Sequence, residues 1–218
     1  MNPLRAFLLL AVSATVAAQT PPPAKTPYTT EEERLFGAAV LKAVYRIQPL
    51  SKDFKLTISD RAAPVVPAVE EDKWVNLACE NVVDFGFAGA EADNLGGLIA
   101  ATCKDGAQVR ELAPRAKARA AAELKEMSVP EGKARKMGWY SAHEKLKDGA
   151  DFYYFPVIVT GHGVGFFLTG ALVDKSGSAI VVQTAATFLC EDVKDSPFCK
   201  DARKALLQLA QALREARK

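Results

Sequence analysis

The sequence predicts an α+β fold, in which an antiparallel sheet packs against helices. Residues 136–189 hold four segments rich in aromatic and β-branched residues, joined by short spacers, which is typical of a C-terminal four-stranded meander. Before and after that region, apolar residues recur every three or four positions, as in helices with one buried side. A sheet covered by N-terminal, central and C-terminal helices is the simplest architecture that buries both patterns.

Residues 1–18 have the pattern of an export signal. Arg5 precedes a short apolar run, and small residues that suit a signal peptidase end at Ala18. The run is shorter than the roughly 20 apolar residues that span a bilayer, and no second candidate span follows. We expect cleavage after Ala18 and a periplasmic or secreted mature protein, with an uncleaved N-terminal anchor as the alternative.

Residues 19–28 (QTPPPAKTPY) form a proline-rich spacer, and residues 29–218 have the length of a single α+β domain. The formal net charge of the 218-residue chain is only +2. A nucleic-acid-binding protein usually carries a strongly basic face, so nucleic acid is not the expected partner.

The first element of the domain is a helix that ends before Pro49. Its start contains a capping box, in which either Thr29 and Glu32 or Thr30 and Glu33 exchange hydrogen bonds. Three consecutive glutamates also favour the positive end of the helix dipole. The helix therefore begins near residue 30.

The middle of the chain combines strands with helices. Residues 54–58 alternate apolar and polar side chains, whereas two prolines interrupt residues 61–67. The predicted elements are a strand at 54–58, a loop at 61–67, two strands or one bulged strand at 74–87, a short helix from Asp93, and a helix at 107–127 that Pro114 starts or kinks.

The four strands of the meander are expected at 136–142, 152–160, 164–173 and 179–189. Short glycine-containing loops at residues 161–163 and 174–177 suit hairpins between antiparallel neighbours. Pro156 indicates an edge or a bulge in the second strand, because proline cannot donate to a sheet ladder. A last helix follows Ser196 and Pro197 and buries a stripe that ends at Leu213.

The chain contains four cysteines, an even number that an exported protein is expected to pair. We expect a disulfide between Cys190 and Cys199, across a short polar loop, and by elimination a second between Cys79 and Cys103. A four-thiolate zinc site would need closely spaced cysteine pairs, which are absent. No metal and no cofactor are expected.

The two histidines, His143 and His162, are weak candidates for catalysis. The sequence contains no G-x-S-x-G nucleophile elbow. A hydrolase would have to bring His162 or His143 close to Ser141, Glu144 or Asp174 through folding. The glycines around His162 are more simply explained by a hairpin turn. The chain is therefore expected not to be an enzyme, with a hydrolase as the alternative.

Aromatic residues crowd two neighbouring strands of the meander. Tyr153, Phe155 and Phe167 are expected on a strip that is either covered by a helix or partly exposed, with His162 at the adjacent hairpin tip. Partly exposed rings are suited to binding because they supply contact area at little entropic cost. The function expected from the sequence is binding of a protein partner or a small apolar ligand, for example as an inhibitor or immunity-type protein.

Overall fold

The computed structural model describes residues 30–47, 55–58, 65–67, 74–76, 79–88, 97–159, 165–185 and 200–217. These residues form an α+β fold around a seven-stranded antiparallel sheet with the order β1-β4-β5-β9-β8-β7-β6. The strands of this sheet are β1 Lys55–Ile58, β4 Cys79–Ala88, β5 Gly97–Cys103, β6 Ala142–Lys145, β7 Asp151–Val159, β8 Gly165–Val173 and β9 Ala179–Ala185. A separate pair comprises β2 Val65–Pro67 and β3 Trp74–Asn76.

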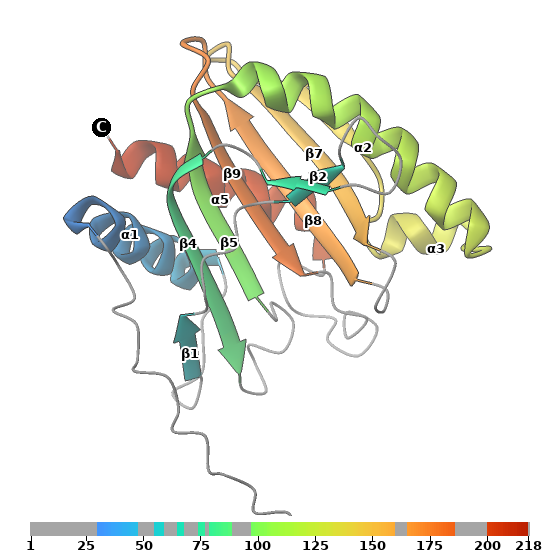
Figure 1. Ribbon diagram of the computed structural model, residues 1–218, viewed down its shortest axis with the longest axis horizontal. Helices are drawn as coiled ribbons and strands as arrows, with labels where there is room; N and C mark the ends of the chain where they lie inside the picture. The colour runs from blue at the N-terminus through green and yellow to red at the C-terminus, as the bar shows by residue number, and fades with distance from the viewer. Residues whose placement is uncertain are drawn as a thin grey trace, which may run out of the picture.

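Helices cover both faces of the sheet (Figure 1). The described helices are α1 Glu31–Ile47, α2 Gly106–Glu126, α3 Glu131–Lys136 and α5 Ala202–Ala216. One face carries α2, which contacts β7, β8 and the small β2–β3 pair. The other face carries α1 and α5, which contact each other and lie against β4, β8 and β9. The protein is thus a three-layer arrangement with the sheet in the middle.

Each face of the sheet has its own hydrophobic core. Strand β7 shows the division, because alternate side chains point to opposite faces. Phe152 and Tyr154 pack in the core beneath α1 and α5, whereas Phe155 and Val157 pack in the core beneath α2. Both cores combine β-branched and aromatic residues of the meander with alanines and leucines from the helices and other strands.

The N-terminal helix and the antiparallel order of the C-terminal meander match their predictions. Thr30 and Glu33 form the capping box: the Glu33 amide donates to Thr30 Oγ1 at 3.1 Å, and the Thr30 amide donates to Glu33 Oε2 at 3.3 Å. Strands β6 to β9 are consecutive antiparallel neighbours. Pro156 lies beyond the last residue of β7 that pairs with β6, which confirms its predicted position at an edge.

Three predicted elements are wrong. Val65–Pro67 is a strand instead of a loop. The strand tolerates a proline because Pro67 is the last residue of its short pair with β3. From residue 97 onward, the helix predicted from Asp93 is instead strand β5, which lies between β4 and β9, whereas residues 93–96 lie outside the described residues. Residues 136–142 are not a strand: the helix α3 ends at Lys136, and the first strand of the meander begins only at Ala142.

Candidate functional site

A groove lies where α2, α3 and the edge of the sheet meet. Helix α2 ends at Glu126 with Met127 as its C-cap, and Ser128 has a left-handed conformation with φ 55°. Pro130 then precedes the first turn of α3, where its fixed φ is favourable. After α3, Gly138 has φ 76°, a value that glycine adopts without strain. The first reversal turns the chain from α2 into α3, and the second turns it from α3 toward β6, so that both helices line one groove.

The groove has a volume of about 530 Å³, which is within the range of small-ligand sites. Its floor consists of buried residues from three elements and the α3–β6 connection: Ala120 is 4% exposed, Ala134 5% and Trp139 4%, and Pro156 of β7 is also buried. Small side chains on α2 and α3 leave the space, because larger residues at these positions would fill it. The floor is therefore apolar and firmly placed.

Aromatic rings shape one wall of the groove. Tyr140 is partly buried, and its ring centroid lies 5.1 Å from that of Tyr154 in the core. The guanidinium carbon of Arg135 lies 5.7 Å from the centroid of the Tyr140 ring, within range of a cation–π interaction. The ring thus holds a positive charge at the rim.

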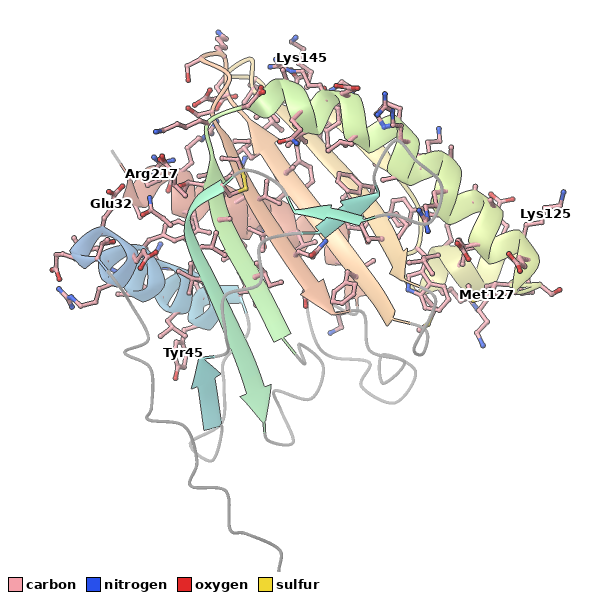
Figure 2. The ribbon with its side chains drawn as sticks, viewed as in Figure 1. Glu32, Tyr45, Lys125, Met127, Lys145 and Arg217 are labelled. Atoms are coloured by element: carbon pink, nitrogen blue, oxygen red, sulfur yellow. A yellow bond between two sulfur atoms is a disulfide. The ribbon has the colours of Figure 1, made fainter. Side chains whose placement is uncertain are left out.

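Two lysines of α2 complete the rim. Lys117 and Lys125 line the groove and are exposed. Figure 2 shows Lys125 near the C-terminal end of α2, close to Met127. Neither lysine forms an ion pair within the described part of the chain. By contrast, Arg115 of the same helix pairs with Glu111 at 2.8 Å. The two ammonium groups are therefore available to an anion.

One carboxylate, that of Glu131, lies at the rim. Its nearest oxygen is 4.0 Å from Arg135 Nε, and the two side chains are 90% and 68% exposed. An exposed ion pair at that distance has a small interaction energy, so Glu131 does not cancel the positive charge of the groove. Residues 106–136 contain eight lysines and arginines but four glutamates, whereas the whole chain has a formal net charge of only +2. Positive charge is therefore concentrated on the α2–α3 hairpin.

A second polar cluster lies near the N-terminal end of α2, at the start of β7. His143 Nε2 lies 3.0 Å from Asp151 Oδ1, and the His143 ring stacks on Tyr153 with centroids 4.5 Å apart and planes 9° apart. Arg110 of α2 reaches within 3.9 Å of Asp151 Oδ2. Burial, followed by the charge of Asp151, raises the pKa of Tyr153. The cluster joins α2 to strands β6 and β7.

The structure does not assemble the hydrolase site considered from the sequence. The Glu144 carboxylate accepts a hydrogen bond from Arg203 of α5 at 2.6 Å. Asp174 caps the turn between β8 and β9, where it accepts the Ser178 amide at 2.9 Å. The carboxylate partner of His143 is Asp151, which sequence reasoning missed because pairing across β6 and β7 depends on the strand register. Ser141 lies in the wall of the groove.

The predicted aromatic strip is only partly available. Phe155 is 1% exposed and packs beneath α2, so its ring does not form a binding surface. Of the two alternatives for the strip, cover by a helix applies at Phe155, because α2 contacts β7. Tyr153 and Phe167 are partly buried at the margin of the same core. His162 lies outside the described residues.

The structure contains the Cys79–Cys103 disulfide. The two cysteines are directly opposite each other in the β4–β5 ladder, with Cα atoms 4.0 Å apart. The other predicted disulfide, between Cys190 and Cys199, lies outside the described residues. None of the helices in the described ranges is long and apolar enough to cross a membrane.

The groove itself is absent from the sequence-based site predictions. Its floor depends on Trp139 and on alanines whose burial follows from the position of α3, and residues 136–142 were expected to form a strand. The one available signal was the excess of lysine and arginine between residues 106 and 136. No protein-family model matches the chain, and no curated protein matches it. The functional proposal therefore rests on the geometry and charge of the groove.

Proposed function

We propose that this chain is an exported, non-enzymatic protein that binds a protein partner or a small apolar ligand in the groove between α2 and α3. The observation that supports this function is an apolar, largely pre-formed floor beneath a positively charged rim. Ligand sites typically combine an apolar pocket with a small number of polar groups. The apolar floor supplies affinity, and the polar groups orient the ligand. An inhibitor or immunity-type protein would use the same features to hold one side chain of its target.

Two observations support export. The Cys79–Cys103 disulfide fits an oxidising compartment, because disulfides seldom persist in a reducing cytosol. Residues 1–18 have the composition of a cleavable signal. A periplasmic or secreted location is therefore proposed. N-terminal sequencing of the purified native protein tests it: a start at Gln19 agrees with the proposal, whereas a start at Met1 favours the anchored alternative.

Photo-crosslinking in intact cells tests the binding function. A photoreactive phenylalanine analogue replaces Ala121, which is exposed and lines the groove. The control carries the same analogue at Ala122, which is also exposed but does not line the groove. We expect a discrete adduct from position 121 that position 122 does not give. Equal labelling from both positions, or no adduct from either, would contradict a binding role for the groove.

A hydrolase is the second candidate function, and the pairing of His143 with Asp151 favours it. A carboxylate can hold a histidine in the orientation that a general base needs. Within the described residues, however, His143 hydrogen-bonds to Asp151 and to no hydroxyl group. An assay with p-nitrophenyl butyrate tests this candidate. Activity that is lost in both His143→Ala and Ser141→Ala would support it, whereas a rate equal to buffer would exclude this ester chemistry.

A further inference from the structure

We infer that the ligand of the groove is an anionic amphiphile: a free molecule with one apolar chain or ring and one carboxylate or phosphate group. This inference rests on the proposed function and specifies its ligand class. The apolar part enters over Ala120 and Trp139, and the anionic group remains at the rim between the lysines. The floor favours the apolar half of the ligand, and the rim favours the anionic half.

The floor selects an apolar group. Ala120, Ala134, Trp139 and Pro156 are all buried, yet all of them line the groove. They offer carbon surface from α2, α3 and β7, and a polar group placed there would lose its hydration. The volume of about 530 Å³ is sufficient for one chain or ring system. The floor therefore excludes a ligand that is charged throughout its length.

The rim selects an anion. Lys117, Ala121 and Lys125 follow one another at intervals of four residues, so they lie along one side of α2. The small side chain of Ala121 leaves an opening between the two lysines. The lysines are eight residues apart, which is about 12 Å along a helix axis, so their flexible side chains can converge above that opening.

The opposite side of the groove strengthens the same preference. Arg135 is the cation contributed by α3, and the Tyr140 ring lies beneath it. With Glu131 included, the rim has three positive charges and one negative charge. A neutral amphiphile would fill the floor but gain nothing at the rim, whereas a cationic one would be repelled.

Fluorescence of Trp139 provides a direct measurement. The chain contains two tryptophans, so Trp74→Phe leaves Trp139, which lines the groove, as the remaining reporter. The probes are dodecanoate, dodecyl phosphate, dodecanol and dodecyltrimethylammonium, each kept below its micellar or solubility limit. We expect saturable changes in Trp139 fluorescence with both anions. Dodecanol should bind about tenfold more weakly, because two exposed ion pairs together contribute about a factor of ten in affinity. The cation should not bind, because the positive rim repels it.

Two sets of variants locate the binding. Lys117→Ala with Lys125→Ala should reduce dodecanoate affinity to the level of dodecanol and leave dodecanol binding unchanged. Lys42→Ala removes an exposed lysine from α1, on the other face of the sheet, and should change neither. Ala121→Phe should abolish binding of both probes by blocking the opening, whereas the neighbouring Ala122→Phe should have no effect. Circular dichroism confirms that each variant is folded.

The outcomes separate this inference from the proposed function. Equal affinity for dodecanoate and dodecanol, or no binding of any probe, would overturn the anionic amphiphile. A discrete photo-crosslink at position 121 would then still support a groove that binds a different ligand. Co-sedimentation with phosphatidylglycerol vesicles, if lost in the double lysine variant while free dodecanoate fails to bind, would identify a membrane surface instead. Binding of single-stranded DNA that depends on the same lysines would likewise contradict the inference.

Discussion

Tyr154 connects the sheet to the segment that forms the wall of the groove. Its hydroxyl donates a hydrogen bond of 2.5 Å to the Gly138 carbonyl oxygen, between α3 and β6. The residue is 1% exposed, and burial raises the pKa of this tyrosine well above its usual value of 10. The phenol is therefore a fixed, protonated support for the position of Trp139 and Tyr140.

The pH dependence of stability should reveal this tyrosine. The folded state holds the Tyr154 proton more tightly than the unfolded state does. The contribution of Tyr154 to the free energy of unfolding is therefore complete below pH 10 and falls as the pH rises above 10. Urea unfolding between pH 8 and pH 11 should show this loss. Tyr154→Phe should reduce the free energy of unfolding by about 1–2 kcal/mol at pH 8 and flatten the alkaline decline. A decline as steep as that of the wild type would contradict this assignment.

Packing at the level of elements depends on one close approach between α5 and β8. A Cβ atom added at Gly170 of β8 would lie 2.8 Å from Leu206 Cβ and 3.1 Å from Phe152 Cζ. Leu206 is fully buried at the centre of the α5 stripe. A glycine at this position therefore lets the helix rest directly on the sheet.

Substitution of this glycine should separate the two elements. Gly170→Ala is expected to lower the free energy of unfolding by about 1–3 kcal/mol, because α5 or Phe152 has to move. Gly132→Ala in α3 is the matched control, since no atom lies within 4 Å of its added Cβ. Chemical denaturation measures both variants. Equal stability of the two would show that α5 can shift without cost.

The capping box of α1 provides a separate test of local structure. Thr30→Ala removes the hydroxyl that accepts the Glu33 amide, whereas the backbone amide of residue 30 can still donate to the Glu33 carboxylate. The free energy of unfolding should fall by about 1 kcal/mol. Thr30→Ser retains the hydroxyl and should preserve most of the stability. Loss of the same amount in both variants would attribute the effect to the threonine methyl group.

Patterns that repeat along the chain predicted most of the elements correctly. Strands β7 and β8 were found to within a residue or two, since aromatic and β-branched residues and short loops indicate the same structure there. Strand β5 was missed because alanines and glycines favour no state strongly, and its neighbours β4 and β9 decide it. The α3 helix was missed for a related reason: its six residues depend on the turns around them.

At the scale of the whole molecule, the Cys79–Cys103 disulfide joins the start of β4 to the end of β5, across a separation of 24 residues. A crosslink over that length restricts the unfolded chain and contributes about 3 kcal/mol. The variant with both Cys79→Ala and Cys103→Ala should lose stability by about that amount in thermal unfolding. The other two cysteines are unchanged in this variant, so the loss belongs to this bridge. An unchanged melting temperature would contradict the contribution.

The candidate site was less predictable than the fold. The pattern of a strand or helix is local, whereas the groove requires α2, α3 and β7 to meet. Trp139 and Pro156 are 17 positions apart in the sequence and share one floor. The Cys79–Cys103 pair was predicted by elimination, because an even number of cysteines is expected to pair and Cys190 and Cys199 flank one short loop. The His143–Asp151 contact required the register of β6 and β7, which composition does not determine.

The position of β5 beside β9 affects the order in which the protein can be assembled. Residues 98–103 pair with residues 179–184, so one edge of β5 has its partner only after nearly the whole chain has been synthesised. During synthesis on the ribosome, this edge stays open until β9 has emerged. An open strand edge is prone to pairing with other chains. Nascent forms of this protein that stop short of residue 179 should therefore depend on holding chaperones, whereas the full-length chain supplies β9 as the partner of β5.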